Sequence, residues 1–163
     1  MIDVLVAISI LFAGSQESIQ NNQDVIERAK IYACLQSKDC RYLSEAAFYE
    51  ARGERDYGVM AVMKTIINRA RHSRFPDTIK DVVIRPHAFS YRHDGSMKKA
   101  RQNPQQWARM RLIAFEMLSG ERDIDIGGAT HYHTIRVKPH WSSQFDMTME
   151  IDRHRFYACT GYC

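Results

Sequence analysis

The sequence lacks the short motifs that identify several large classes of enzyme. Its 163 residues contain no P-loop, no glycine-rich dinucleotide fingerprint and no G-x-S-x-G nucleophile elbow. The H-E-x-x-H pattern of many zinc peptidases is also absent. We therefore expect no metal or other cofactor, and look for catalytic groups among ordinary side chains.

The chain also has no internal repeat, no low-complexity tract and no long apolar run. Its most apolar stretch, Val4 to Ala13, is interrupted by Ser9 and followed by small residues up to Ser15. This run is too short to span a bilayer comfortably but fits the apolar region of a signal peptide, although Asp3 precedes it and no Lys or Arg does. We predict that residues 1–15 are a signal peptide or a signal-anchor, with a buried N-terminal helix as the alternative.

Cysteine is scarce, and its arrangement agrees with export. The four cysteines form two close pairs, Cys34 with Cys40 and Cys159 with Cys163. Disulfides persist in oxidising compartments, so this pattern favours a periplasmic or extracellular location. Two local disulfides are the simplest connectivity, and cross-pairing is the alternative. A structural zinc site is disfavoured because neither spacing is the usual two-residue knuckle.

The net charge of +4 is small, and the length suits a single domain with a real core. A mild positive charge favours an anionic polymer such as cell wall, nucleic acid or a membrane surface, without choosing among them. We assign residues 16–40 to a polar spacer followed by a helix from Asp24 to Leu35. Residues 41–163 are expected to form one catalytic domain.

The most informative stretch, residues 42–71, predicts two helices that meet at Gly53. Apolar residues recur at spacings of three and four in both halves, and a glycine commonly follows the end of a helix. Glu50 then lies in the last turn of the first helix, beside the apolar stripe. Poor hydration there raises the pKa of a carboxyl, and one that keeps its proton near neutral pH can act as a general acid. The alternative is a solvated glutamate beside Arg52 and Arg55.

The rest of the chain predicts a mainly α-helical, α+β protein with a small β region. Trp107 is expected to pack in the core. The remaining elements expected are a short helix over residues 77–84, a strand within residues 87–95, a helix from the capping pair Asn103-Pro104 to Gly120, and a strand within residues 127–134.

Histidines and aromatic residues near these strands suggest two further chemistries. His131, His133, His140 and His154 permit a metal site, as in a zinc amidase, but solvent-facing or substrate-contacting histidines are favoured. Aromatic rings with polar neighbours would form a carbohydrate groove by stacking on sugar faces, the alternative being that half or more of them fill the core. The rings concerned are Phe89, Tyr91, Tyr132, Trp141, Phe156 and Tyr157.

Several sequence blocks, in order, resemble one known family. They are FYEARGERDYGVMAVMKTIINRA, FPDTIKDVVIRPHAFS, SGERDIDIGGATHYHT, HW and HRFY, and they cover about Leu43 to Tyr157. The chain resembles the SleB-type cell-wall hydrolases, which are the spore cortex-lytic enzymes and their relatives in bacteria and bacteriophages. The resemblance implies a lysozyme-like fold and cleavage of peptidoglycan between N-acetylmuramic acid and N-acetylglucosamine.

The resemblance also implies a mechanism and a set of site residues. Cleavage would be a lytic transglycosylation, in which the muramic acid's own 6-hydroxyl closes an anhydro ring, so neither water nor a second carboxylate is required. Glu50, the first glutamate of EARGE, would be the catalytic acid and base, and Glu54 would have a secondary role. The substrate-binding residues expected are Phe89, Ser90, Tyr91, Thr130, Tyr132, His133, Trp141, His154 and Tyr157.

One residue departs from the family pattern: Ala88 stands where the family often has glutamine, so contacts at that subsite are expected to differ. Three alternatives stay open: a hydrolysing muramidase in which Glu54 or Asp56 helps to activate water, a non-catalytic peptidoglycan-binding or virion protein, and a metallo-amidase. We expect a monomer that binds glycan strands and no nucleic acid, and that meets a membrane only through its leader. A bacterial enzyme and a phage enzyme acting in the host periplasm both fit.

Overall fold

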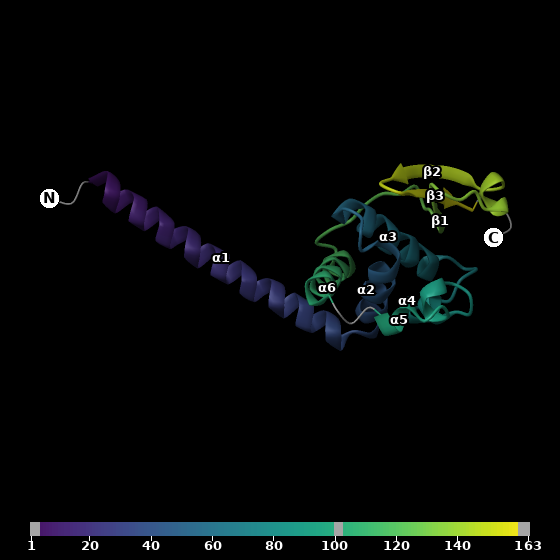
Figure 1. The fold of residues 1–163 in the computed structure, drawn as a ribbon, viewed down its shortest axis with the longest axis horizontal. Coiled ribbons are helices and arrows are strands. Elements are labelled where there is room, and N and C mark those ends of the chain that lie inside the picture. Colours follow the sequence, from purple (N-terminus) through teal and green to yellow (C-terminus); the bar gives the residue numbers. More distant parts are fainter. Residues whose placement is uncertain (1–3, 100–102, 160–163) are drawn as a thin grey trace.

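Helices form most of the molecule, and a small sheet lies against them at one end (Figure 1). The computed structural model describes residues 4–99 and 103–159. The α-helices are α1 (Val4–Gln36), α2 (Lys38–Ala51), α3 (Asp56–Arg71), α4 (Ile79–Ile84), α5 (Ser96–Lys99) and α6 (Pro104–Ser119). The 3-10 helices are η1 (Ser90–Arg92) and η3 (His140–Ser143), and the strands are β1 (His131–Thr134), β2 (Asp146–Ile151) and β3 (His154–Ala158).

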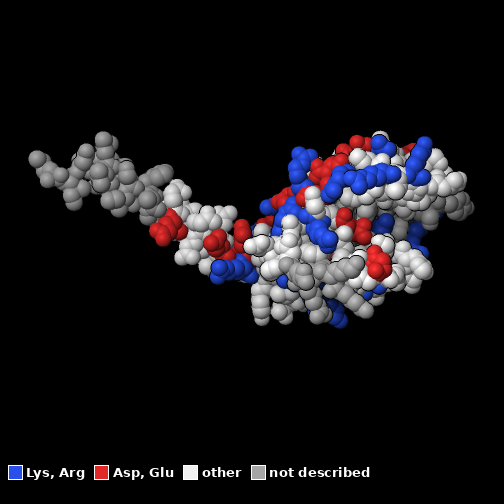
Figure 2. Space-filling model, viewed as in Figure 1, with Lys and Arg blue, Asp and Glu red and all other residues white. Residues whose placement is uncertain are grey.

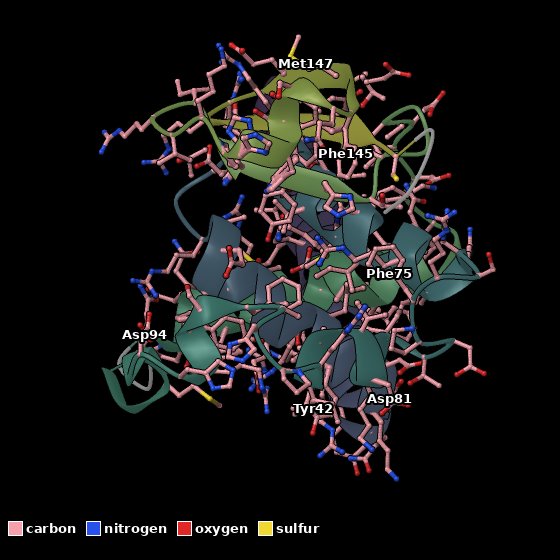
Figure 3. All side chains as sticks on the ribbon, turned by 90° about the vertical axis from the view of Figure 1, so that its right-hand side faces the viewer. Tyr42, Phe75, Asp81, Asp94, Phe145 and Met147 are labelled. Atoms are coloured by element: carbon pink, nitrogen blue, oxygen red, sulfur yellow. A yellow bond between two sulfur atoms is a disulfide. The ribbon has the colours of Figure 1, made fainter. Side chains whose placement is uncertain are left out.

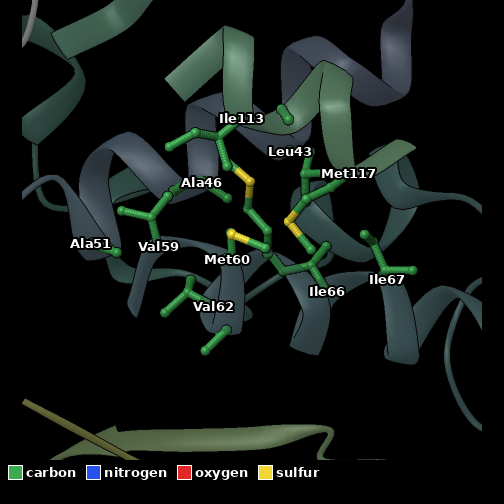
Figure 4. Packing of buried hydrophobic residues seen from close by; sticks show 14 of the residues in the cluster. Leu43, Ala46, Ala51, Val59, Met60, Val62, Ile66, Ile67, Ile113 and Met117 are labelled. Atoms are coloured by element: carbon green, nitrogen blue, oxygen red, sulfur yellow. The ribbon is translucent and has the colours of Figure 1, made fainter. Parts of the chain in front are cut away.

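Helices α2, α3 and α6 pack around one hydrophobic core (Figure 4). Each helix turns an apolar face inwards, so that Leu43, Met63 and Met110 are fully buried. Apolar residues spaced by three or four positions share one face of a helix, and burying that face stabilises the packed helices. Trp107 stacks on Phe48 with 4.1 Å between ring centroids, which confirms its expected place in the packing.

The helix boundaries follow the capping signals in the sequence. α2 ends at Ala51 and α3 begins at Asp56, so the predicted pair of helices meeting near Gly53 is confirmed. At the start of α6 the side chain of Asn103 accepts a hydrogen bond from a backbone N–H of the first turn. Gly120 follows α6 with φ of 81°, a left-handed conformation that favours glycine.

The sheet is antiparallel with the order β1-β3-β2, so β3 is central. The strand expected within residues 127–134 is confirmed as β1. Successive side chains of a strand point to opposite faces. Tyr132, opposite Phe156, therefore faces the helices, whereas His131 and His133 point to the other face of the sheet and contact Trp141 of η3.

The strand expected within residues 87–95 is wrong. η1 occupies this region and lies outside the three-stranded sheet. Tyr91 turns inwards, stacks on Tyr49 at 4.3 Å, and donates a hydrogen bond to Glu45 at 3.1 Å. Two alternating aromatic residues are too short a pattern to specify a strand, which needs a neighbouring strand for its backbone hydrogen bonds. Conversely, β2 was not predicted, although Met147, Met149 and Ile151 alternate with three polar residues along it.

Helix α1 is continuous and extends away from the body of the molecule (Figure 1). The spacer expected over residues 16–23 is therefore wrong, because this stretch is helical and rich in Gln and Glu, which are good helix formers. Lys30 pairs with Glu116 at 3.1 Å and with Glu121, and so fastens α1 next to α6. None of the helices that the structure describes is long and apolar enough to cross a membrane.

The disulfide between Cys34 and Cys40 joins the end of α1 to α2. The local pairing expected for these two cysteines is confirmed, and cross-pairing of this pair is excluded. Cys159 is also disulfide-bonded, while Cys163, its expected partner, lies outside the described residues. The division of the chain at residues 15 and 40 stays a prediction.

Acidic and basic side chains are interspersed over the body of the molecule on the face shown in Figure 2. Ion pairs of the described residues include Arg153 with Glu54 and Arg155 with Glu150, each with an N–O distance of 2.7 Å. The face shown in Figure 2 thus mixes both signs of charge and presents no single broad basic field.

Candidate active site

A cavity of about 700 Å³ lies where the end of α2, the η1–α5 segment and the sheet meet. Figure 3 looks onto this side of the molecule, with the sheet above the helices and Asp94 at one edge of the view. Polar and aromatic side chains share the cavity wall, as in a site for a sugar. The lining residues are Phe48, Tyr49, Glu50, Arg52, Ser90, Tyr91, Asp94, Ser96, Asn103, Tyr132, His133, Thr134, Val137 and His154.

Glu50 lies in the last turn of α2 and is half-buried in this wall. The hydroxyl of Tyr132 donates a hydrogen bond to Oε2 of Glu50 over 3.2 Å. Within the part of the chain that the structure describes, Glu50 forms no ion pair. A carboxyl without a cationic partner is stabilised in its protonated form by removal from water.

Burial is the main reason that the pKa of Glu50 lies above the ordinary value for glutamate. The hydrogen bond from Tyr132 and the positive charge of Arg69 act in the opposite direction, because both stabilise the ionised form. The negative charge of Asp94 adds to the rise. The expectation of a raised pKa at the end of this helix is confirmed, and the carboxyl is suited to donating a proton.

Other hydrogen-bonding side chains, from η1 and the sheet, line the same cavity. The ring of His154 meets Tyr132 edge-on at 5.5 Å, and burial lowers the pKa of His154, so this imidazole is neutral at neutral pH. His133 is hydrogen-bonded through Nε2 to the hydroxyl of Tyr157 at 2.8 Å. Burial raises the pKa of Tyr91, whose hydroxyl therefore keeps its proton. Such groups can bond to sugar hydroxyl and acetamide groups without adding charge.

Five of the nine expected substrate-binding residues line the cavity: Ser90, Tyr91, Tyr132, His133 and His154. Their contact with substrate stays a prediction.

The other four lie behind or beside the cavity wall. Phe89 is buried under the guanidinium of Arg69, and Thr130 offers its carbonyl to the same side chain. Tyr157 supports His133, and Trp141 packs edge-on against Tyr157 at 5.4 Å. These side chains shape the wall from outside the lining, so we expect them to contribute through the residues that they hold.

Glu54 does not line the cavity. It is 8% exposed, and its carboxylate accepts a hydrogen bond from Nε of Arg153 at 2.7 Å. At the same turn, the backbone N–H and side chain of Arg55 both donate to Asp152. Gly58 permits this close approach, because a Cβ there would lie 2.5 Å from Oδ2 of Asp152. Two ion pairs thus join the α2–α3 turn to the β2–β3 turn.

Asp56, the other carboxylate considered for water activation, is also outside the lining. It pairs with Arg109 at 2.6 Å and with Arg122 at 3.0 Å. These partners hold the pKa of Asp56 below its usual value although burial opposes them. Neither Glu54 nor Asp56 is therefore placed to activate water in the cavity.

Sequence reasoning missed eight lining residues. Phe48 and Thr134 lie within α2 and β1, and the other six are Tyr49, Arg52, Asp94, Ser96, Asn103 and Val137. Tyr49 and Arg52 flank Glu50, and their proximity in the sequence was a usable signal. The remaining four of these six come from loops and helix ends without a periodic pattern, and no local signal identified them.

The described residues contain no group of three or more His, Cys, Asp or Glu side chains arranged to hold a metal ion. His131 and His133 lie on the face of β1 opposite to Tyr132, with their rings against Trp141, and His133 also lines the cavity. Burial lowers the pKa of His131 to about 4. The described residues thus offer no set of metal ligands for the metallo-amidase alternative.

Comparison with known sequences identifies relatives of this chain. A family described as Cell Wall Hydrolase matches residues 53–157, which include Glu54 and begin just after Glu50. The spore cortex-lytic enzyme of Halalkalibacterium halodurans is 32% identical over 114 residues, covering 69% of this chain and 32% of that protein. The enzyme of the same name from Oceanobacillus iheyensis is 39% identical over 59 residues, or 36% of this chain and 21% of that protein. The chain thus spans a third or less of these curated relatives.

Two solved structures share the fold. The catalytic domain of the germination-specific lytic transglycosylase SleB from Bacillus anthracis matches 75% of this chain and 96% of that domain, with a TM-score of 0.60 and 26% identity. The catalytic domain of Bacillus cereus SleB matches 75% of this chain and 91% of that domain, with a TM-score of 0.57 and 27% identity. These matches confirm the expected fold class, mainly helical with a small sheet.

Proposed function

Because this chain belongs to the Cell Wall Hydrolase family, we propose that it cleaves peptidoglycan glycan strands by lytic transglycosylation. The bond cut is the one between N-acetylmuramic acid and N-acetylglucosamine. The observation that carries the proposal is a half-buried Glu50 with a raised pKa in the wall of a polar and aromatic cavity. The name of the Bacillus anthracis neighbour, a lytic transglycosylase, supports the choice of reaction.

Glu50 performs both proton transfers in this reaction. Its carboxyl first protonates the glycosidic oxygen, so the bond from C1 of the muramic acid to that oxygen breaks and the N-acetylglucosamine leaves as an alcohol. The 6-hydroxyl of the same muramic acid then bonds to C1 and gives its proton to the carboxylate of Glu50. The acid is thereby regenerated and no water is consumed. One carboxyl that works near its pKa suffices for both steps.

The lining of the cavity favours transglycosylation over hydrolysis. An ordinary glycosidase needs a second carboxylate as base or nucleophile. Glu54 and Asp56 lie outside the lining and are paired with arginines. Asp94 is the remaining carboxylate among the lining residues, and it makes a hydrolysing muramidase the second candidate.

The products distinguish the two candidates. Purified peptidoglycan is incubated with the protein, and the released fragments are measured by mass spectrometry. We expect muramic acid ends that are 1,6-anhydro, without the water that hydrolysis adds. Reducing muramic acid ends would replace the proposed reaction by hydrolysis and direct attention to Asp94. If no glycosidic bond is cut, the non-catalytic peptidoglycan-binding alternative takes its place.

Removing the hydroxyl of Tyr132 should change how Glu50 depends on pH. The Tyr132–Glu50 hydrogen bond stabilises the carboxylate, so its loss in Tyr132→Phe raises the pKa of Glu50 further. Activity that needs the protonated acid then persists to higher pH, while the maximal rate falls by about fivefold because one orienting bond is lost. The measurement is the rate of release of anhydro fragments from pH 4 to 9.

The control for this variant is Tyr157→Phe. It removes a hydroxyl that is bonded to His133 and leaves the Tyr132–Glu50 contact in place. Its alkaline limb should coincide with that of the parent. If Tyr132→Phe also left the alkaline limb of the pH–rate profile unchanged, the Tyr132 hydroxyl would have no effect on the pKa of Glu50.

The proposed substrate also sets the place of action. Peptidoglycan lies outside the cytoplasm, so we propose that the protein is exported. The two expected disulfides, of which Cys34–Cys40 is one, support an oxidising compartment.

A further inference from the structure

The last turn of α3 holds the chain just before β1 through two side chains. Nδ2 of Asn68 donates a hydrogen bond to the carbonyl of Ala129 at 2.9 Å. Nε of Arg69 donates to the next carbonyl, that of Thr130, at 2.6 Å. Two consecutive residues therefore bind two consecutive carbonyls, and Tyr132 follows two residues later.

The guanidinium of Arg69 is itself held in place by aromatic rings. It lies 5.6 Å from the ring centroid of Phe75 and 5.7 Å from that of Phe89. Phe89 is 3% exposed, and Figure 3 shows Phe75 on the side where the sheet meets the helices. A cation between two rings is fixed in position and partly shielded from water. Phe89, expected to bind substrate, thus contacts Arg69 on the helical side of the cavity wall.

The positive charge of Arg69 acts on both members of the Tyr132–Glu50 pair. It lowers the pKa of the Glu50 carboxyl and that of the Tyr132 hydroxyl, against the larger effect of burial on each. Arg69 forms no ion pair with Glu50 in the described structure, so the carboxyl remains available to a substrate.

We propose that Asn68 and Arg69 form a two-point clamp that holds β1 over the end of α2, and that Arg69 also supplies a fixed positive charge beside the Tyr132–Glu50 pair. Both are positioning residues, because they act through Tyr132 and Glu50. The inference rests on the proposed function for its kinetic consequence alone; the geometry and the titration of Glu50 are independent of what the protein cleaves.

The two clamp residues should have different effects when changed. Asn68 carries no charge, so its loss acts on Glu50 only by moving Tyr132 and weakening the Tyr132–Glu50 hydrogen bond, which raises the pKa of Glu50 no further than Tyr132→Phe does. Loss of the Arg69 charge removes an interaction that favours the carboxylate, and the pKa of Glu50 then rises. The other charged or titratable groups that line the same cavity are Tyr49, Arg52, Tyr91, Asp94, Tyr132, His133 and His154. None of them changes in these variants.

The first experiment titrates Glu50 without substrate. The carboxyl carbon resonances of glutamate are followed by NMR from pH 3 to 9 in labelled protein, and Glu50→Gln identifies the resonance of Glu50. We expect the midpoint to move to higher pH in Arg69→Gln, to stay near that of the parent in Arg69→Lys, and to rise in Asn68→Ala by no more than it does in Tyr132→Phe. An unmoved midpoint in Arg69→Gln would overturn the electrostatic part of the proposal.

The second experiment measures the pH dependence of fragment release. Asn68→Ala should lower the maximal rate about tenfold, with an alkaline limb that moves no further than in Tyr132→Phe, since a displaced group costs mainly rate. Arg69→Gln should lower the rate similarly and extend activity to higher pH. A full rate in both Asn68→Ala and Arg69→Lys would overturn the clamp.

The proposal stays testable if a variant fails to fold or if the parent protein is inactive. If Arg69→Gln fails to fold, Arg69→Lys keeps the electrostatic part testable, because the titration midpoint of Glu50 in that variant must match the midpoint in the parent. Asp94→Asn serves as the comparison. It removes a negative charge that raises the pKa of Glu50, so it must lower the midpoint. A midpoint shifted in Arg69→Lys would overturn the role of the charge. If the parent cuts no glycan, the proposed function fails, whereas the NMR titration still tests the inference.

Discussion

Replacing Glu50 with glutamine should lower the rate of glycan cleavage by about a thousandfold or more. Glutamine has nearly the same shape, but it can neither give a proton to the leaving oxygen nor take one from the 6-hydroxyl. A positioned acid or base contributes roughly 10²–10⁴ in rate, and here one carboxyl serves both steps. The measurement is the initial rate of anhydro fragment release from purified peptidoglycan at the pH optimum of the parent.

The fold of this variant should remain intact. The side-chain amide oxygen of Gln can accept the hydrogen bond that Tyr132 donates to Glu50, so the unfolding temperature should stay close to that of the parent. The matched control is Asp94→Asn, which alters the other carboxylate in the lining and should retain activity if that group is no base. Undiminished cleavage by Glu50→Gln would end the assignment, and loss of activity in Asp94→Asn would favour the muramidase.

Replacing Glu54 with alanine should have the largest effect on stability. The Glu54 side chain is 5% exposed, and the loss of its charge-assisted bond to Arg153 leaves a small cavity. We expect the free energy of unfolding to fall by about 2 to 3 kcal/mol, because hydrogen bonds to charged groups contribute about 1.5 to 3 kcal/mol. Arg153 is largely exposed and can return to water, which keeps the loss below that of a fully buried pair. Urea unfolding followed by circular dichroism measures it.

Activity should fall together with stability in Glu54→Ala. Arg153 directly precedes His154, which lines the cavity, so releasing this turn loosens one wall of the site. The control is Arg55→Ala at the neighbouring pair with Asp152, where the arginine is 84% exposed. Such an exposed pair contributes about 1 kcal/mol or less. A Glu54→Ala protein as stable as the parent but inactive would instead indicate a direct chemical role for Glu54.

The two glutamates of the EARGE motif therefore differ because the helix ends between them. Residues four apart share a face only while a helix continues. α2 ends at Ala51, where the N–H of Glu54 bonds to the Ala51 carbonyl at 2.9 Å and closes a turn. Glu50 is left facing the cavity, and Glu54 is carried to the opposite side, against the β2–β3 turn. The turn thus separates two carboxylates that stand only four residues apart in the sequence.

Local chemistry determined much of this protein from its sequence. The helix pair around Gly53, the capped start of α6 at Asn103 and the local disulfide between Cys34 and Cys40 follow from residues close together in the chain. The raised pKa of Glu50 also follows locally, because the last turn beside an apolar stripe is poorly hydrated. Signals of this kind act over one or two helical turns, which is why a single sequence carries them.

Only the tertiary structure decided which side chains meet. Tyr132 reaches Glu50 across 82 residues of sequence, and Arg153 reaches Glu54 across 99. The same packing placed Tyr91 in the 3-10 helix η1, where a strand was expected, and placed Trp141 outside the cavity. Contacts between distant segments depend on how helices and sheet pack as whole elements, and no periodicity within either segment encodes them. The proposed catalytic acid, Glu50, could thus be identified in the sequence, whereas the groups that tune and hold it became visible only in the folded chain.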